Sequence, residues 1–356
     1  MSEFDFGPFA PYVLDDDITD INYNGRQLWL DHLKRGRYVE EEFYCSESME
    51  QFCYRFANHS NASFNQSFPI IETETRELRF SILHDSISKS GFSVSIRKTP
   101  AIMRLRKEEM IRSEYASVQV LQLLAACIQA RCNILICGLP GAGKTELVKY
   151  LTSFIPGHQR VITIEDTLEI RYAQLHPYKD SVSLKVHDRF DYGNAIKASL
   201  RQRPDWLLLS EVRSKEVVQL LESVSTGAKL ISTLHADTAR AIPMRLLHMF
   251  PGMELSNETL LQTIYQNIDI GIHIESRITK EGIGRYIKEI VYFEVDEQGK
   301  TVQHLLFHRY LHPTIAPLPE TLQNQIAAVQ DENTCKASAG TKTRSKKQKA
   351  KESYET

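Results

Sequence analysis

Near the middle of the chain, a glycine-rich loop ends in a lysine and a threonine: Gly138-Leu139-Pro140-Gly141-Ala142-Gly143-Lys144-Thr145. Its spacing is a complete G-x-x-x-x-G-K-T phosphate-loop motif. A strand-like apolar run, residues 133–137, precedes the motif, and a helix-like run that opens at Glu146 follows it. Because the motif requires a strand before it and a helix after it, we expect residues 138–146 to bind the phosphates of a nucleoside triphosphate.

The residue types of the loop suit a polyphosphate bound together with Mg²⁺. Glycines let backbone amides turn inward around the β-phosphate without obstruction by a Cβ atom. The first amides of the following helix add positive potential there. Lys144 supplies a point charge for the β- and γ-phosphates, and the Thr145 hydroxyl can bind Mg²⁺. The sequence contains no base-reading Asn-Lys-x-Asp motif, so we expect ATP rather than GTP.

Outward from the loop, short apolar runs alternate with segments of helix length. The runs are residues 134–136, 161–164, 206–209 and 229–233. Such runs between helices are typical of parallel strands that are covered on both faces. The sequence therefore predicts an α/β fold with a mostly parallel sheet.

Polar residues follow three of these runs. Glu165, Asp166 and Glu169 come after the second run, and Glu211 comes after the third. The carboxyl ends of strands are where an open α/β sheet places its site, although a carboxylate there can also cap the next helix. Two such clusters in one chain favour catalysis. His235 ends the fourth run, where it is either a packed core residue or a sensor of the γ-phosphate.

The part of the chain before the loop predicts a smaller α+β domain. Strand-like runs and one helix-like run fill it: residues 18–23, 28–30, 78–82 and 92–97, and residues 51–60. Asn24-Gly25 separates the first two runs, which predicts a tight hairpin with positive φ at both central residues.

We expect four parts along the chain. They are an N-terminal α+β domain at 1–98, an interdomain linker at 99–115, an ATPase domain at 116–330 and a tail at 331–356. Residues 284–295 and 301–308 predict a second hairpin within the ATPase domain. The tail is rich in lysine and has no periodic apolar pattern. It is either a disordered, solvated basic tail or a contact with a membrane surface or nucleic acid.

Composition narrows the class of protein. A chain of 356 residues with 42% hydrophobic and 25% charged residues is neither collagen-like nor globally disordered. Its 43 Lys and Arg against 45 Asp and Glu leave a formal charge of −2, so direct binding of nucleic acid is not expected. The longest apolar region, residues 120–139, is interrupted by polar residues, and the six cysteines form no C-x-x-C pair. We therefore expect a cytoplasmic protein with free thiols.

Four signatures resemble, in order, those of the type II/type IV secretion ATPases, and most closely the branch that serves Tad/Flp pili and type IV secretion (conjugation). They are the phosphate loop at 138–145, an aspartate box at 164–169, a Walker B segment at 203–213 and a histidine box at 225–236. The resemblance implies a RecA-like P-loop NTPase core that hydrolyses ATP, assembled as a homohexameric ring. It also implies a motor that works beside integral membrane platform proteins, peripherally associated with the cytoplasmic membrane.

The same resemblance implies roles for individual residues. Glu165 would be the base that activates water, Glu211 would hold Mg²⁺ through water, and His235 would sense the γ-phosphate. Arg79 and Arg97, on strands of the N-terminal domain, resemble the arginines that close over the phosphates. An arginine that reaches developing phosphoryl charge contributes about 10³–10⁵ in rate.

The sequence departs from the family pattern at several points. Ser210 stands where the family usually has glycine, and Ala228 where it often has histidine. A tetracysteine zinc insertion does not occur, which favours the Tad or conjugative branch. The sequence does not determine which process the motor drives: pilin extension, pilin retraction, effector export or DNA conjugation. The alternative class is a RecA-like nucleic-acid translocase or helicase; a small-molecule kinase fits the long preceding domain less well.

Overall fold

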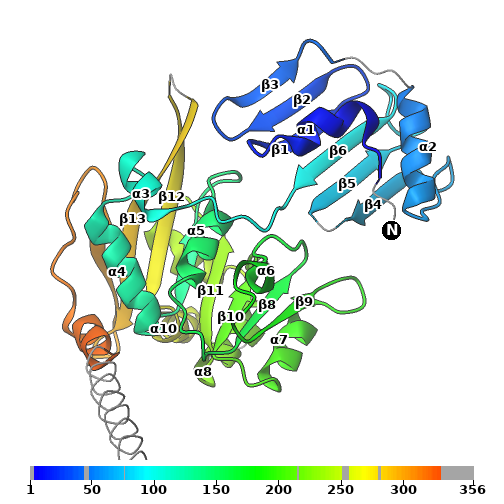
Figure 1. Cartoon of the computed structure of the whole chain (residues 1–356). Coiled ribbons are helices and arrows are strands. Elements are labelled where there is room, and N and C mark those ends of the chain that lie inside the picture. Colours follow the sequence, from blue (N-terminus) through cyan, green and yellow to red (C-terminus); the bar gives the residue numbers. More distant parts are fainter. Residues whose placement is uncertain are drawn as a thin grey trace, which may run out of the picture. The chain divides into compact units, whose positions relative to one another are not determined.

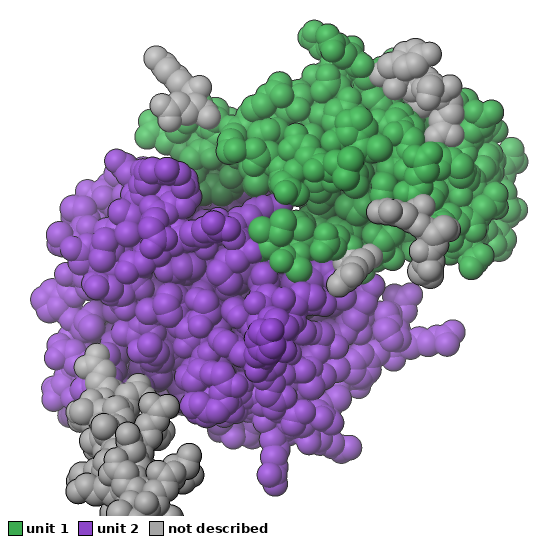
Figure 2. Space-filling view, viewed as in Figure 1, with its two compact units in different colours: residues 1–102, 276–285 green, residues 103–275, 286–356 purple. Residues whose placement is uncertain are grey.

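The computed structural model describes residues 4–43, 48–75, 77–214, 216–250, 256–279 and 282–329. Figure 2 shows its two compact units. Unit 1 comprises Met1–Ile102 with Ser276–Arg285, and unit 2 comprises Met103–Glu275 with Tyr286–Thr356. The tail expected at 331–356 lies outside the described residues. No helix in the described ranges is long and apolar enough to cross a bilayer.

Unit 1 is built on a six-stranded antiparallel sheet in the order β3-β2-β1-β6-β5-β4 (Figure 1). Buried residues alternate along β5, and Phe80 among them lies with its ring centre 4.3 Å from that of Phe56 on α2. The Ser48 and Gln51 side chains cap the start of α2 reciprocally. The elements are η1 (Gly7–Phe9), α1 (Ala10–Leu14), β1 (Ile18–Tyr23), β2 (Leu28–His32), β3 (Gly36–Glu40), α2 (Met49–His59), β4 (Ile70–Glu74), β5 (Leu78–Leu83) and β6 (Ser93–Lys98).

The predicted β1–β2 hairpin is confirmed, but the prediction of its turn was wrong. The loop has four residues, and the Asn24 N–H closes it by donating to the Gln27 carbonyl at 3.1 Å. In this fully described loop, Gly25 takes a positive φ of 92° and Asn24 does not. The Asn24 side-chain oxygen accepts from the N–H groups of Arg26 and Gln27 instead. This local bonding stabilises the longer loop.

Unit 2 is built on an eight-stranded sheet in the order β14-β13-β12-β7-β11-β10-β8-β9. The pairs from β12 across to β9 are parallel, and β13 pairs antiparallel with β14. The predicted mostly parallel sheet and the second hairpin are therefore confirmed.

The strands of this sheet are β7 (Ile134–Cys137), β8 (Val161–Glu165), β9 (Ser181–Lys185), β10 (Trp206–Leu209), β11 (Lys229–Leu234), β12 (Ile270–Thr279), β13 (Gly282–Val295) and β14 (Thr301–His308). The end of β12 and the start of β13 fall within Ser276–Arg285 of unit 1. The helices after Lys98 are α3 (Lys107–Arg112), α4 (Val118–Gln129), α5 (Lys144–Thr152), α6 (Tyr172–Leu175), α7 (Tyr192–Leu200), α8 (Val217–Ser225), η2 (Ala239–Ala241), α9 (Ile242–Leu247) and α10 (Asn257–Asn267). The stretch expected as a linker, residues 99–115, thus contains α3.

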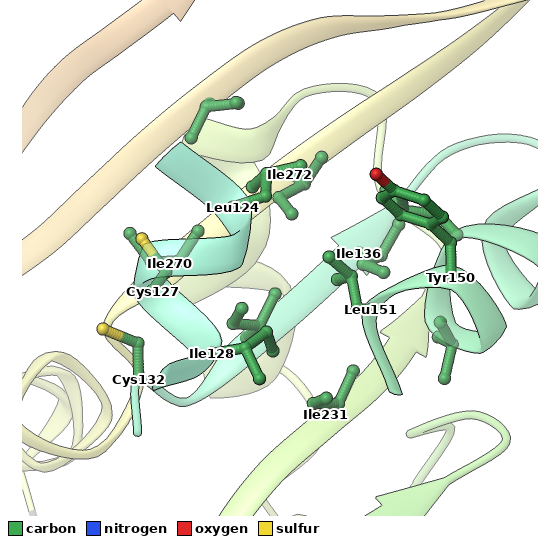
Figure 3. Close-up of a cluster of buried hydrophobic side chains, with 14 of the residues drawn as sticks. Leu124, Cys127, Ile128, Cys132, Ile136, Tyr150, Leu151, Ile231, Ile270 and Ile272 are labelled. Carbon is green, nitrogen blue, oxygen red and sulfur yellow. The ribbon is translucent and has the colours of Figure 1, made fainter. Parts of the chain in front are cut away.

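Both faces of the four strands predicted from apolar runs, β7, β8, β10 and β11, are buried. In β7, Ile134 and Ile136 belong to one hydrophobic cluster, whereas Leu135 and Cys137 belong to the other. Figure 3 shows the first cluster, in which Leu124 of α4 packs near β7 and β12. Because successive residues of a strand point to opposite faces, a fully apolar strand needs such a two-sided cover.

Two strands of the sheet were not predicted. β9 lies at the sheet edge beside β8, and its side chains are only partly buried, so it has no apolar run. β12 begins with five buried residues and then becomes exposed. It lies between β7 and β13 and so joins the predicted parallel strands to the predicted hairpin.

Candidate functional site

The phosphate loop connects the buried end of β7 to the start of α5. Gly138 takes a φ of 149°, and a Cβ atom there would lie 2.4 Å from the Ile274 carbonyl oxygen of β12. Gly143 takes a left-handed conformation, with φ 91°, immediately before the helix. The first amides of α5 have no acceptor within the helix, so the loop and helix start present N–H groups to a ligand.

Lys144 lies at the base of this loop and is 9% exposed. Its Nζ atom donates to the carbonyl oxygens of Gly138 at 2.8 Å and Leu139 at 3.2 Å, and lies 3.4 Å from His235 Nδ1. Burial lowers the pKa of Lys144 below its ordinary value, although the negative charge of Glu211 opposes this. A partly desolvated ammonium at this position is suited to bind an anion.

Two carboxylates lie near the end of β8. Glu169, in the turn after the strand, faces the phosphate loop, and Glu165, the last residue of the strand, is buried. Thr145 Oγ1 donates to Glu169 Oε2 at 3.1 Å. Glu165 is 1% exposed, and its Oε2 accepts from the N–H groups of Glu169 and Ile170, both at 2.8 Å. Burial raises the pKa of Glu165 to about 7, even though these hydrogen bonds lower it. Glu165 therefore fixes the turn from which Glu169 reaches Thr145.

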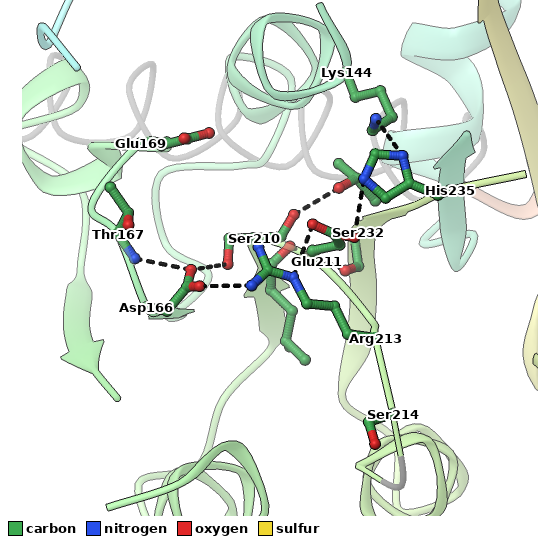
Figure 4. Close-up of polar contacts among 12 residues, drawn as sticks. Lys144, Asp166, Thr167, Glu169, Ser210, Glu211, Arg213, Ser214, Ser232 and His235 are labelled. Carbon is green, nitrogen blue, oxygen red and sulfur yellow. Dashed lines mark hydrogen bonds and ion pairs between the residues drawn. The ribbon is translucent and has the colours of Figure 1, made fainter. Parts of the chain in front are cut away.

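Glu211 lies between two basic side chains after β10 (Figure 4). Its Oε1 is 3.3 Å from His235 Nε2, and its Oε2 accepts from Arg213 Nε at 2.9 Å. His235 reaches the phosphate loop through Nδ1, which lies 3.2 Å from the Gly138 carbonyl oxygen. The strand order places the ends of β7, β11, β10 and β8 next to one another, which brings these groups to one edge of the sheet.

Asp166 lies on the other side of Arg213. Its Oδ2 accepts from Arg213 Nη1 at 2.8 Å, and its Oδ1 faces the Ser210 hydroxyl (Figure 4). The same Oδ1 also faces the Tyr192 hydroxyl. Burial raises the pKa of Asp166, but the Arg213 charge and the hydrogen bonds outweigh it, so the pKa lies below the ordinary value. Asp166 is therefore an ionised anchor for Arg213.

Three other residues named from the sequence, Glu146, Arg79 and Arg97, make different contacts. The Glu146 carboxylate pairs with Lys149 at 2.9 Å and with Arg104 at 3.8 Å. In unit 1, Arg79 of β5 and Arg97 of β6 are cross-strand partners. The Arg97 guanidinium donates to Asp20 at 2.8 Å. The phosphate contact expected of these two arginines stays a prediction.

Glu169, Arg213 and Tyr192 have no individual role in the site expected from the sequence. Glu169 and Arg213 belong to the aspartate box and the Walker B segment, so their place in those signatures was an available signal. Tyr192 is 26 residues from Asp166 along the chain. No sequence pattern linked the two, because only the packing of α7 beside β8 brings them together.

Comparison with known protein families matches residues 68–292 to the family described as Type II/IV secretion system protein. The chain belongs to this family. The resemblance stated from the four signatures is confirmed. The match covers the phosphate loop, both acidic clusters and His235, as well as β5 and β6 of unit 1.

Curated relatives extend the comparison. The conjugal transfer protein TrbB of Rhizobium radiobacter is 28% identical over 209 residues, which are 58% of this chain and 61% of TrbB. The type IV secretion system protein VirB11 of Brucella suis is 25% identical over 231 residues, which are 62% of this chain and 63% of that protein. The matched segment spans about six tenths of the length of these curated relatives.

A solved structure shares the fold. The ATPase DotB of Yersinia pseudotuberculosis superposes with a TM-score of 0.59 and 15% identity, over 82% of this chain and 81% of that chain. The predicted fold class is confirmed: a RecA-like P-loop NTPase core with a mostly parallel sheet and a smaller N-terminal α+β part.

Proposed function

We propose that this chain binds ATP with Mg²⁺ and hydrolyses it to drive a bacterial secretion or pilus-assembly machine. The observation that carries the proposal is the group of side chains around one phosphate loop: Lys144, Thr145, Glu169, Glu211 and His235. Their chemistry fits the nucleotide, because an ammonium suits phosphate oxygens while hydroxyl and carboxylate oxygens suit Mg²⁺. Gly138, which has no room for a Cβ atom, keeps the loop in the required conformation.

Each side chain has a role in this proposal. Lys144, which donates to two loop carbonyls, would donate instead to the β- and γ-phosphates. Thr145 would hold Mg²⁺ directly and Glu211 would hold it through water. Mg²⁺, when bound, neutralises charge that develops on the phosphates. His235, in contact with both Glu211 and the Gly138 carbonyl, would sense the γ-phosphate.

The remaining two roles belong to Glu165, at the end of β8, and Glu169, in the turn that follows it. We propose Glu165 as the base that activates water, since a pKa of about 7 suits a general base at neutral pH. Glu169 accepts a hydrogen bond from the Thr145 hydroxyl and would orient the oxygen of that hydroxyl toward the metal. The Glu165→Gln variant should keep its affinity for ATP and lose turnover. If its turnover is unchanged while Glu169→Gln abolishes turnover, the base is Glu169.

For the assembly, we propose a homohexameric ring in the cytoplasm, peripherally associated with the membrane through integral platform proteins. The secretion-system family supports membrane machinery as the partner, as does the similarity to TrbB, a conjugal transfer protein, and to VirB11, a type IV secretion system protein. Arg79 and Arg97 would close over the phosphates. No comparison reported above supports the nucleic-acid translocase. Light scattering with and without ATP tests the ring, and a single species at the mass of the monomer in both conditions would refute it.

Phosphate release from ATP tests the activity. The unaltered chain should release phosphate and bind a fluorescent ATP analogue, and Lys144→Ala should lose both properties. Lys197→Ala, on the exposed side of α7, is the matched control and should behave like the parent. In the host, Lys144→Ala should block piliation or plasmid transfer. Stimulation of turnover by single-stranded DNA, rather than by membranes or partner proteins, would favour the translocase instead.

A further inference from the structure

We propose that Tyr192 and Ser210 position Asp166, and that Asp166 acts through Arg213 to hold the Glu211 carboxylate in its working orientation. We call these four residues, Tyr192, Ser210, Asp166 and Arg213, the Asp166 brace. The inference rests on the proposed ATP hydrolysis, because it assigns positioning roles for that reaction. Figure 4 shows Asp166, Ser210, Arg213 and Glu211 of this arrangement.

The outer end of the brace is a set of hydrogen bonds around Asp166, whose Oδ1 also accepts from the Thr167 N–H at 2.8 Å. The Asp166 N–H donates to the Tyr192 hydroxyl oxygen at 3.2 Å. That hydroxyl lies 2.8 Å from Ser210 Oγ and 3.3 Å from Asp166 Oδ1, and Ser210 Oγ lies 3.4 Å from the same Oδ1. The two hydroxyl protons can satisfy both the Tyr192–Ser210 contact and the carboxylate oxygen, so no donor is left over.

The position of Tyr192 is itself fixed by the start of α7. Asp191 caps this helix by accepting from the Asn194 N–H at 2.8 Å. Tyr192 is the first helical residue, so its backbone is set by the cap. The backbone that carries the Tyr192 hydroxyl is therefore held independently of Asp166.

Arg213 transmits that geometry to Glu211. Its Nη1 donates to Asp166 and its Nε to Glu211, so one planar guanidinium spans two carboxylates. The backbone N–H of Arg213 is also held, because it donates to Glu216 Oε1 at 2.8 Å. Without Asp166, the Arg213 side chain would lose one of the two carboxylates that orient it, and Glu211 Oε2 would lose a fixed donor.

Glu211 then connects the brace to the phosphate loop. Its other oxygen, Oε1, faces His235, and His235 lies within 3.4 Å of the Lys144 ammonium. A continuous series of polar contacts therefore runs from Tyr192 to Lys144. A shift of Asp166 changes the direction of the Glu211 carboxylate, because rigid hydrogen-bond geometry joins the two.

The exposure of these groups argues for positioning rather than for stabilisation of the fold. The Arg213 side chain is 52% exposed and that of Asp166 is 32% exposed. Ion pairs with this exposure contribute little to stability. Disturbing the brace should therefore change the free energy of unfolding only a little. Its role is to orient the Glu211 carboxylate.

Removal of single hydroxyls tests the brace. Tyr192→Phe should lower kcat about 3-fold to 10-fold, which corresponds to the loss of one or two hydrogen bonds, with KM for ATP nearly unchanged. Ser210→Ala should act in the same direction. The double variant should lose less than the product of the two single effects, because the two hydroxyls share a contact. Tyr178→Phe is the matched control, because Tyr178 lies in the same unit and is 99% exposed.

A second readout separates positioning from a general loss of structure. If Glu211 holds Mg²⁺ through water, Tyr192→Phe should raise about 3-fold the Mg²⁺ concentration that half-saturates binding of a fluorescent ATP analogue. A merely structural role would lower the melting temperature and leave this concentration unchanged. If Tyr192→Phe fails to fold, Ser210→Ala gives the same test with a smaller change.

The two proposals fail in different ways. If the parent hydrolyses ATP while Tyr192→Phe and Ser210→Ala match Tyr178→Phe in kcat and Mg²⁺ dependence, the brace is refuted and the ATPase stands. If the parent releases no phosphate and Lys144→Ala binds the analogue as well as the parent does, the proposed function is refuted and the brace with it.

Discussion

Replacement of Glu165 by glutamine removes a buried ionisable group while nearly keeping its shape. The Glu165 side chain is 1% exposed, and both of its described hydrogen bonds go to one oxygen, Oε2. A glutamine carbonyl oxygen placed there can accept the same two N–H groups, from Glu169 and Ile170. The variant therefore loses the charge and keeps the turn. We expect it to be more stable than the parent above neutral pH.

The magnitude follows from the pKa of Glu165. Burial raises this pKa to about 7, against 4.5 for an ordinary glutamate, and the difference corresponds to about 3 kcal/mol. The folded chain keeps the proton over a pH range in which the unfolded chain has lost it. The contribution of Glu165 to the free energy of unfolding of the parent therefore falls as the pH rises from about 4.5 to 7 and is constant above that range. Glu165→Gln has no such proton to lose.

Urea unfolding, followed by the fluorescence of the buried Trp206, measures the effect. Parent and Glu165→Gln should have nearly equal free energies of unfolding near pH 4.5, and should differ by about 3 kcal/mol at pH 8. Glu222→Gln, on the exposed face of α8, is the matched control and should track the parent at every pH. A difference between Glu165→Gln and the parent that does not change with pH would refute the reasoning. The same variant should be inactive, so stability would rise while turnover is lost.

Three other substitutions follow from the geometry. Gly138→Ala should lower stability by about 2 kcal/mol or more and abolish ATP binding, as read from thermal melts and the fluorescent analogue, because its Cβ atom would meet the Ile274 carbonyl at 2.4 Å. Asn133→Ala should cost about 1–3 kcal/mol in urea unfolding, since the buried Asn133 Oδ1 accepts the Leu230 N–H at 3.0 Å; a neutral result would contradict this. Ser48→Ala should cost about 1 kcal/mol in urea unfolding of unit 1 through the loss of the α2 cap, with Ser48→Asp largely restoring it.

The local elements of this protein were readable from the sequence. The apolar runs that became β7, β8, β10 and β11 lie where they were predicted, and so do α2 and the hairpin of β13 and β14. Such elements depend on the period and length of an apolar run, which are local properties. The G-x-x-x-x-G-K-T spacing likewise determined the loop between β7 and α5, because glycines with positive φ must stand at set positions.

Other features were not readable from the period and length of the apolar runs. The β1–β2 turn differed from the prediction because the Asn24 side chain bonds to its own loop, which the Asn-Gly pair alone did not show. The edge strand β9 has no apolar run, so only its pairing with β8 reveals it.

The identity of the acidic clusters was determined by the sequence, but their geometry was not. Chain order could not say that Glu165 would be buried beneath the turn while Glu169 faces Thr145. Nor could it place the Tyr192 hydroxyl beside Asp166, 26 residues away. Hydrogen-bond partners at such separations are set by the lateral order of the strands and by helix packing. The strand order and the helix packing follow from the burial of all the apolar faces together. That burial is a property of the tertiary structure alone.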